Sequence, residues 1–222
     1  NASDSILKSS HASLSVWIKR EKIYKQTHNI FTFHAGDLST PNAISGLSVA
    51  IERKFLKVIY TDHKGQLFDK SKQFDFSDNS WHQITTSIKP NSFTIYIDGK
   101  KLLNINKTLG AFGNTPFHLG SFKGIQKSYV GLLDELAFFD ISLNASQVRE
   151  LYNKGNASDL SNLSFNNSLY HWYQFGDHPQ DDSSNIEDII TTGLSIPHGI
   201  AIDEINGKVY WVDYGVDKIQ RA

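Results

Sequence analysis

The chain has 222 residues, 39% of them hydrophobic, and its 22 basic and 23 acidic side chains give a formal net charge of -1. This length suits one large β domain, or one domain and a fragment of another, with a sizeable hydrophobic core. The even mixture of charges gives no basic stripe for nucleic acid, and no apolar run approaches the roughly 18 residues of a membrane span, so we predict neither partner.

Cysteine and methionine are both absent. The absence of cysteine excludes disulfides, cysteine-ligated zinc and thiol chemistry. Methionine is absent even at position 1, which predicts a processed product or a segment of a longer protein. Asn-X-Ser/Thr sequons occur about twice as often as the roughly two to three that the composition would give by chance, which favours an extracellular or cell-surface glycoprotein. They begin at Asn1, Asn106, Asn144, Asn156, Asn162 and Asn166.

Short stretches of alternating apolar and polar residues predict antiparallel strands. In residues 13–19, Leu14, Val16 and Ile18 share one face and Trp17 lies on the other, as in a half-buried strand. Strands of the same kind, separated by polar or glycine-containing links, are predicted at 29–34, 46–51, 55–60, 117–121 and 130–139. Such short strands at intervals of about 8–12 residues indicate an antiparallel sandwich or jelly roll.

Residues 81–101 predict a hairpin. Residues 89–92 (Lys-Pro-Asn-Ser) reverse the chain, and Asp98-Gly99 tolerates the positive φ of a tight turn at the far end. Phe93, Ile95 and Ile97 share one face. We expect this face to meet the core and the opposite face to be available to solvent.

The stretch from Tyr129 to Gly155 predicts a buried strand, an acidic turn and the one convincing helix of the chain. Ser142 or Asn144 can cap the helix at its start, and Gly155 can supply the left-handed residue at its end. The helix has roughly two and a half turns, which is too short to be stable alone, so we expect it to pack on the sheet.

Four segments together resemble a laminin-G-like domain of the concanavalin A-like lectin and glucanase superfamily. They are "SLSVWIK", "SWHQITTSIKPNSFTIYIDGKKL", "FHLGS" and "GLLDELAFFDISLNASQVRELYNKG". The resemblance extends over about residues 5–176 and implies an all-β, antiparallel jelly-roll sandwich with one short helix at its edge. Members usually open with an apolar strand and a Phe-Asp-Gly-like turn, whereas only residues 1–11 precede the Trp17 strand here. That first strand is either degenerate or lies outside this chain.

The C-terminal region has a different character. Residues 169–175 predict a closing strand, and the polar residues 177–192 predict a linker after a sandwich domain at 1–176. Residues 193–222 then resemble one YWTD repeat of the low-density-lipoprotein-receptor type of β-propeller, with Tyr-Trp-Val-Asp at 210–213 in the motif position. A single blade cannot bury its own faces, so we expect a continuation in the natural protein or pairing with another subunit.

A glycoside hydrolase needs two carboxylates at short range. The glucanases that share this fold project them from one strand in a Glu-X-Asp-X-X-Glu arrangement. Asp134 and Glu135 are adjacent in the matching strand, and strict alternation places them on opposite faces. They could then not flank one glycosidic bond, so we predict that the chain is not an enzyme.

Calcium is the one cofactor that the resemblance implies, because laminin-G-like and related sandwich domains often hold it. Calcium takes oxygen ligands from aspartate and from backbone carbonyls, and Asp134 and Asp37 are the candidate ligands. The alternative for Asp134 is a carboxylate that caps the turn or bonds backbone amides. The acidic loop at Asp177, Asp181 and Asp182 lacks a recognised calcium spacing and is interpreted as part of the linker.

The nine histidines match no metal or nucleophile motif. Four aromatic residues, Trp17, Trp81, Tyr96 and Trp172, are candidates for a sugar-stacking platform, with burial in the core as the alternative. Together these features predict a non-catalytic extracellular recognition or adhesion module that binds a glycan or a protein. The alternative is a structural segment of an extracellular filament or surface assembly, completed by neighbouring chains through its sheet edges or C-terminal repeat. Glycoside hydrolysis is a distant third.

Overall fold

The computed structural model describes residues 11–20, 22–34, 46–109, 117–121, 128–157 and 159–175, with only the backbone at 34, and the backbone of three strands between 197 and 221. The chain divides into two compact units, Asn1–Asp181 and Asp182–Ala222. Each unit is described by itself.

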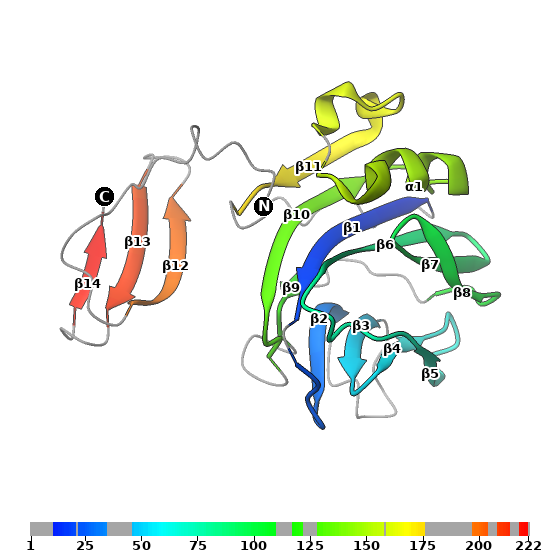
Figure 1. Ribbon diagram of the computed structural model, residues 1–222, viewed down its shortest axis with the longest axis horizontal. Helices are drawn as coiled ribbons and strands as arrows, with labels where there is room; N and C mark the ends of the chain where they lie inside the picture. Colours follow the sequence, from blue (N-terminus) through cyan, green and yellow to red (C-terminus); the bar gives the residue numbers. More distant parts are fainter. Residues whose placement is uncertain are drawn as a thin grey trace. The chain divides into compact units, whose positions relative to one another are not determined.

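The first unit is an antiparallel sandwich of two sheets (Figure 1). The strands of the larger sheet are β1 (Ala12–Lys19), β6 (Trp81–Lys89), β7 (Ser92–Ile97), β8 (Lys100–Ile105), β10 (Leu132–Phe139) and β11 (Leu169–Tyr173), in the order β11-β10-β1-β6-β7-β8. Those of the smaller sheet are β2 (Thr27–His34), β3 (Gly46–Glu52), β4 (Phe55–Thr61), β5 (Leu67–Gln73) and β9 (Phe117–Leu119), in the order β5-β4-β3-β2-β9. The predicted all-β sandwich is confirmed.

The main hydrophobic core lies between the two sheets. Leu14, Val16 and Ile18 of β1 belong to it, as the alternation predicted. Phe93 of β7 meets Tyr60 of β4 edge-on, with ring centroids 5.1 Å apart. Burying such side chains is worth about 1.5–3 kcal/mol each, so this layer accounts for the packing of one sheet on the other.

A second layer covers the outer face of the larger sheet. It consists of α1 (Ala145–Tyr152) and three single turns, η2 (Asn153–Gly155), η3 (Leu160–Asn162) and η4 (Asn166–Ser168). Trp17 is only 2% exposed and its ring stacks on Tyr152, with centroids 5.7 Å apart. The prediction of a half-buried β1 is therefore wrong, because this layer buries the second face of the strand. The outer face of β7 is covered as well, since Tyr96 belongs to the same cluster.

The helix α1 has a complete capping box at its start. Asn144 Oδ1 accepts from the backbone N–H groups of Ser146 and Gln147, and Gln147 Oε1 accepts from the backbone of Asn144. Asn144 is thus the cap, one of the two residues predicted. The helix ends at Asn153, which has a φ of 45°, rather than at Gly155. Asparagine tolerates this left-handed conformation, so the chain turns before it reaches the glycine.

The predicted hairpin is confirmed, with β6 and β7 paired in antiparallel register from Lys89↔Ser92 to Ile84↔Ile97. The strand β5 was not predicted. It pairs along its whole length with β4, yet most of its side chains are exposed. Only Phe68 of β5 packs against the core, where it stacks on Tyr60, so the strand carries no alternation of apolar residues that a sequence pattern could reveal.

A buried histidine ties the start of β6 to the β7–β8 turn. His82 Nδ1 lies 2.7 Å from Asp98 Oδ2, and His82 Nε2 lies 3.1 Å from Asp78 Oδ1. Burial opposes protonation of the ring, but the hydrogen bonds and charges of Asp98 and Asp78 outweigh it and raise the pKa of His82.

We therefore expect a pH-dependent cost for His82→Gln. Because the folded pKa lies above the unfolded one, the stabilisation is complete below about pH 6.5 and is lost as the pH rises through the folded pKa. The substitution should lower the free energy of unfolding by about 1.5–3 kcal/mol in acid and by less in base. Urea unfolding at two pH values measures this, with exposed His63→Gln as the control. An equal loss at both pH values would contradict a charged His82.

The second unit contains three strands, β12 (Pro197–Asp203), β13 (Lys208–Asp213) and β14 (Lys218–Arg221), in an antiparallel sheet of that order. The predicted motif at 210–213 lies in β13. A three-stranded sheet is not by itself a propeller blade, so the predicted repeat is not shown. Among the described residues of both units, no helix is long and apolar enough to cross a membrane.

Candidate functional site

A hollow of about 550 Å³ lies at the end of the smaller sheet where β2 starts and β3 ends. Its volume is within the range of about 300–1,000 Å³ that is usual for ligand sites. The hollow is lined by Lys25, Gln26, Thr27, His28, Glu52, Ser128 and Val130. All of these side chains except that of Val130 carry hydrogen-bonding groups, so the hollow suits a polar ligand.

The register of β2 and β3 builds one wall of this hollow. Thr27 and Glu52 are paired across the two strands, and Thr27 Oγ1 donates to Glu52 Oε2 over 2.9 Å. Lys57 of β4 lies 3.2 Å from the same oxygen. These hydrogen bonds, from Thr27 first and Lys57 second, lower the pKa of Glu52. The Glu52 carboxylate is ionised at neutral pH and shares Lys57 with Asp69, whose Oδ2 lies 3.0 Å from Lys57 Nζ.

A cluster of aromatic and basic side chains, here called the Arg20 cluster, adjoins the hollow and consists of Arg20, Tyr24, His28 and Tyr129. The Arg20 guanidinium carbon lies 5.1 Å from the centroid of the Tyr24 ring. The Tyr24 and His28 rings stack with centroids 4.8 Å apart. Tyr129 donates from its hydroxyl to the carbonyl of Lys19 over 3.0 Å. The cluster joins the end of β1, the start of β2 and the segment before β10.

Several polar atoms of the Arg20 cluster are buried without a partner. Within the described ranges, Arg20 Nε, Arg20 Nη2 and His28 Nδ1 have no hydrogen bond, although Arg20 is 1% and His28 is 6% exposed. Burial lowers the pKa of Arg20 and, together with the positive charge of Arg20, lowers the pKa of His28. Burial also raises the pKa of Tyr129. At neutral pH the cluster therefore holds one cation among uncharged rings.

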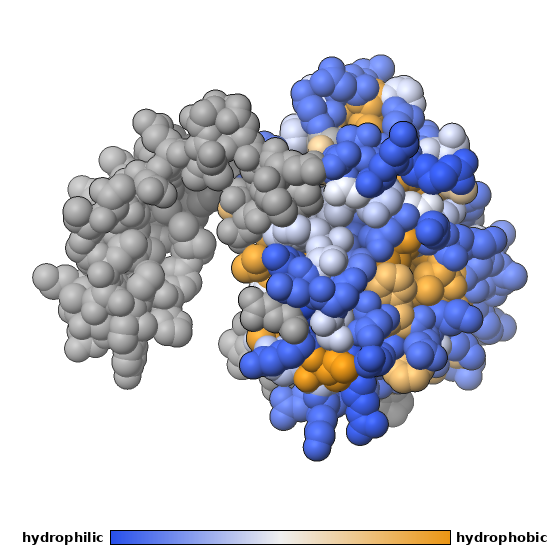
Figure 2. All heavy atoms as spheres, viewed as in Figure 1, coloured by the Kyte–Doolittle hydropathy of each residue, from blue (hydrophilic) through white to orange (hydrophobic). Residues whose placement is uncertain are grey.

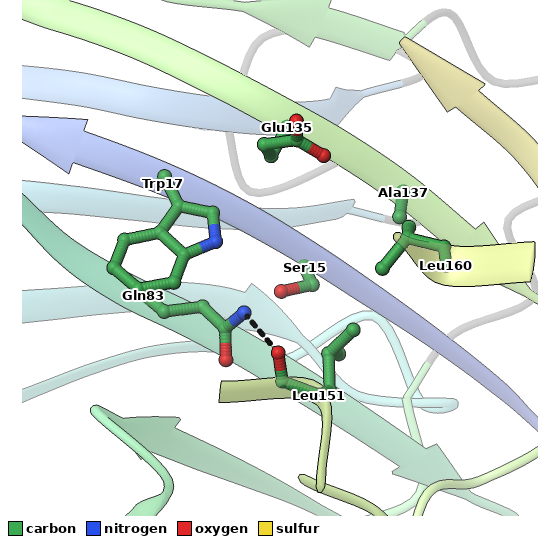
Figure 3. Close-up of a pocket in the computed structure, with 7 residues that line it drawn as sticks. All are labelled: Ser15, Trp17, Gln83, Glu135, Ala137, Leu151 and Leu160. Carbon is green, nitrogen blue, oxygen red and sulfur yellow. Dashed lines mark hydrogen bonds between the residues drawn. The ribbon is translucent and has the colours of Figure 1, made fainter. Parts of the chain in front are cut away.

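A second depression, on the outer face of the larger sheet, does not form a binding site. Figure 3 shows Trp17, Gln83 and Glu135 around it, with Leu151 and Leu160 of the covering layer beside them. Gln83 donates to the carbonyl of Leu151 across it over 3.3 Å. The space between these side chains does not admit even a water molecule. It is an imperfection of packing rather than a site for a sugar.

The predicted placement of Asp134 and Glu135 on opposite faces is wrong. A β-bulge interrupts the β1–β10 register between Asp134 and Ala137, and Glu135 has a φ of 51°. Leu133 and Leu136, three residues apart, both pack in the main core, which strict alternation would forbid. The extra residue of a bulge shifts the alternation by one position.

Both carboxylates bind the segment that includes and follows β11. Asp134 Oδ1 accepts from the backbone N–H of Phe175 over 2.7 Å, and Glu135 accepts from Trp172 Nε1 and from Gln174 Nε2. Asp134 is 0% and Glu135 is 4% exposed. Both groups thus hold the closing strand, and the depression beside Glu135 does not admit even a water molecule.

The described residues around Asp134 do not suit a calcium ion. Asp134 Oδ1 accepts two backbone N–H groups, those of Glu135 and Phe175, whereas calcium requires about six to eight oxygen ligands. In the part of the chain that the structure describes, no group of three or more acidic or histidine side chains could hold a metal. Asp37 and the acidic loop at 177–182 lie outside the described residues. Calcium therefore stays a prediction, and we derive no step from it.

Five of the six sequons can be placed, and their asparagines are exposed: Asn106, Asn144, Asn156, Asn162 and Asn166. Asn1 lies outside the described residues. Four of the five lie in the covering layer of α1 and the single turns, or at its boundaries. Their glycosylation stays a prediction.

The four aromatic candidates do not form a common platform. Trp17 and Tyr96 are buried in the layer under α1. Trp172 is half-buried and donates to Glu135, while Trp81 is half-buried at the start of β6. The alternative of core burial is thus correct for Trp17 and Tyr96.

Sequence analysis missed the hollow and the Arg20 cluster. The residues come from three separate segments, so no motif of fixed spacing joins them. One local signal was available: residues 20–28, the short link between two strands and the first residues of the second, carry Arg20, Lys22, Lys25 and the aromatic pair Tyr24 and His28. A short link between strands needs no aromatic residue for its turn. The aromatic and basic residues here could therefore have indicated a functional segment.

The family model of the concanavalin A-like lectin/glucanases superfamily (Laminin_G_3) matches residues 1–149. The chain belongs to this superfamily. The superfamily contains both lectins and glucanases by its name, so membership alone does not decide between binding and catalysis. The laminin-G-like resemblance of the first unit is thereby confirmed.

One protein of known sequence and two solved structures are similar to this chain. Nidogen-2 of Mus musculus is 56% identical over 36 residues, which are 16% of this chain and 3% of nidogen-2. Domain 4 of an extracellular GH43 arabinanase from Geobacillus stearothermophilus, solved with arabinotriose, has a TM-score of 0.51 at 19% identity and covers 67% of this chain and 69% of that one. A putative carbohydrate binding protein from Bacteroides ovatus has a TM-score of 0.54 at 14% identity, covering 96% and 53%. The two structures support the fold.

Proposed function

We propose that the first unit is a non-catalytic extracellular recognition module that binds a glycan through the hollow at the start of β2. The observation that carries the proposal is the hollow itself, with its volume of about 550 Å³ and its lining of lysine, glutamine, threonine and serine. Sugar hydroxyls need such donors and acceptors. A similar fold solved with arabinotriose and another described as a carbohydrate binding protein support a glycan as the ligand. The alternative ligand for the same hollow is a protein.

The burial of Asp134 and Glu135 supports binding without catalysis. General acid and nucleophile must reach the glycosidic oxygen and the anomeric carbon from an open cleft. Both carboxylates instead accept hydrogen bonds from the β11 segment and lie under the surface. The other acid near a cavity, Glu52, is paired with Lys57.

The distribution of sequons also supports this choice of surface. The asparagines that the structure places lie on α1, the single turns and the end of β8, and none lines the hollow. Glycans at these asparagines would cover the outer layer and leave the hollow accessible. Relatives such as nidogen-2 and the arabinanase described as extracellular are consistent with an extracellular setting, which is part of the proposal.

A glycan array tests the proposal with a double substitution in the lining. Lys25 and Gln26 are exposed, so Lys25→Ala with Gln26→Ala should fold normally. We expect the wild-type protein to bind a subset of glycans and the double variant to bind them at least about tenfold more weakly, the equivalent of one or two lost hydrogen bonds. The matched control is Lys100→Ala with Lys101→Ala, two exposed positions on β8. Equal binding by both variants would refute the hollow as the site.

The second candidate function is a structural role, and one observation favours it. β11 is the last strand at one edge of the described sheet and displays Tyr170, Tyr173 and, just beyond it, Phe175, each more than 40% exposed. Figure 2 shows that the visible face of this unit is mainly hydrophilic, with several hydrophobic patches between the hydrophilic residues. An unpaired edge with aromatic residues can pair with another chain. Sedimentation at increasing concentration distinguishes the two roles, since a recognition module stays monomeric and an assembling subunit does not.

We also propose that residues 193–222 form one YWTD-type repeat after a linker at 177–192, with the sandwich domain at 1–176. The support is the motif at 210–213 and its position in β13, the central strand of a three-stranded antiparallel sheet. Completion by further repeats or by another subunit is part of the same proposal.

A further inference from the structure

Arg20 is an unusual residue for the interior of this domain. Its side chain is 1% exposed, yet none of the ion pairs among the described residues includes it. Two of its nitrogens, Nε and Nη2, have no hydrogen-bond partner. Buried arginines are normally paired with a carboxylate or fully hydrogen-bonded, because desolvation of the charge is costly. The domain therefore keeps a cation whose counter-ion the described chain does not supply.

The neighbours of Arg20 do not compensate for its charge. The Tyr24 ring gives a cation–π contact at 5.1 Å, which is worth about 0.5–2 kcal/mol and leaves Nε and Nη2 without a hydrogen bond. Tyr129 stays protonated, because burial raises its pKa, and its hydroxyl donates to Lys19. His28 is uncharged near neutral pH, because burial and Arg20 lower its pKa. None of these groups is an anion.

The hollow gives a ligand access to the cluster. His28 belongs both to the Arg20 cluster and to the lining of the hollow, and its Nδ1 is buried without a partner. Exposed Lys25 lies at the same opening, and Lys22 Nζ lies 5.6 Å from the Tyr24 ring centroid. The one carboxylate in the lining, Glu52, is paired with Lys57, which also pairs with Asp69. Arg20, Lys22 and Lys25 outnumber Glu52 around the hollow, so the charges there favour an anion.

We propose that the Arg20 cluster binds the acidic group of a glycan, a carboxylate or a sulfate ester, while the neutral part of the sugar occupies the hollow. Arg20 provides the counter-charge and His28 a hydrogen-bond donor, as expected for guanidinium and imidazole groups that meet a planar or tetrahedral oxyanion. Tyr24 contacts both side chains and is half-buried, and the proposal requires its ring to move aside so that the acidic group reaches Arg20. This inference rests on the proposed function, because it names the ligand class of the same hollow.

The pKa of His28 can be used to detect a bound anion. We expect the NMR titration of the His28 ring to show a pKa below about 6.5 in the free protein and a higher pKa when an anion binds beside it. The probes are sialyllactose for a carboxylate, a sulfated heparin disaccharide for a sulfate ester, inorganic sulfate, and lactose as the neutral sugar. At least one acidic sugar should shift His28, and lactose should not raise its pKa. No response of His28 to any acidic probe would overturn the inference.

A substitution of Arg20 separates ligand binding from a structural role. Arg20→Met keeps much of the volume and removes the charge, so affinity for the acidic sugar should fall at least about tenfold. The Tm should rise by about 2–4 °C, because an unpaired buried cation is removed. The control Arg149→Met, at an exposed position of α1, should change neither quantity. If Arg20→Met lowers the Tm and keeps the affinity, Arg20 is structural and the inference fails.

The probes also separate this inference from the proposed function. If neutral glycans bind in the hollow and acidic sugars bind no better, recognition of glycans stands and the acidic ligand class is refuted. If inorganic sulfate shifts His28 while every glycan fails to bind, the proposed function and this inference are both refuted, and the cluster binds an adventitious ion only.

Discussion

Replacing Gly131 with alanine is expected to lower the free energy of unfolding by about 3 kcal/mol or more. Gly131 has a φ of +145°, which other residues rarely adopt, and a Cβ atom there would lie 2.2 Å from the backbone oxygen of Lys19. The same Cβ would lie 2.9 Å from Cε1 and from the hydroxyl oxygen of Tyr129. Backbone strain contributes about 1–3 kcal/mol and the overlap a similar amount. Urea unfolding followed by circular dichroism measures the total.

Gly65 offers a matched control for this substitution. Its φ is +76°, but nothing lies within 4 Å of a Cβ atom built there. Gly65→Ala therefore isolates the cost of the backbone conformation, about 1 kcal/mol. Equal losses in the two variants would contradict the close contact at Gly131. Because the contact atoms belong to Lys19 and Tyr129, Gly131→Ala should also disturb the Arg20 cluster and weaken ligand binding, which Gly65→Ala should not.

The strands that face the core could be predicted because burial between two sheets imposes a period of two. Leu14, Val16 and Ile18 follow this rule, and so do Phe93 and its neighbours in β7. The pattern was uninformative where a single side chain of the strand packs on the core, as in β5, or where the strand is covered on both faces, as in β1. In β1 the serines and Trp17 of the outer face are polar or amphipathic, and only the covering layer shows that they are buried.

The candidate site could be predicted only in part because it depends on long-range pairing. The alternation rule failed at Glu135, where a bulge in the β1–β10 pair adds one residue that no local pattern marks. The hollow is formed by the Thr27↔Glu52 register and by a segment about 100 residues later in the chain. That no described residue forms an ion pair with Arg20 is likewise a property of packing, since Arg20 looks in the sequence like an ordinary surface arginine at the end of a strand.

Asp134→Ala is the second substitution with a large expected effect, a loss of about 3 kcal/mol in the free energy of unfolding. Asp134 is fully buried and accepts from the backbone N–H groups of Glu135 and Phe175. Removal of a buried charged acceptor leaves both donors without this partner, and each such group costs about 1–3 kcal/mol. Asp134→Asn keeps an acceptor oxygen and should cost less, about 1 kcal/mol. Faster hydrogen exchange at the amide of Phe175 should accompany Asp134→Ala, because this bond anchors the end of β11.

The same variants decide between a structural carboxylate and a calcium ligand. A bound calcium ion at about 100 times its dissociation constant would stabilise the fold by about 2.7 kcal/mol, so a chelator would lower the Tm of the wild-type protein and have no effect on Asp134→Ala. A carboxylate that bonds only amides predicts the same Tm with and without chelator, and the geometry at Asp134 favours this result. Asp37→Ala completes the comparison. If the chelator lowers the wild-type Tm and both Asp37→Ala and Asp134→Ala abolish this response, the two aspartates share a calcium ion and the structural interpretation of Asp134 is wrong.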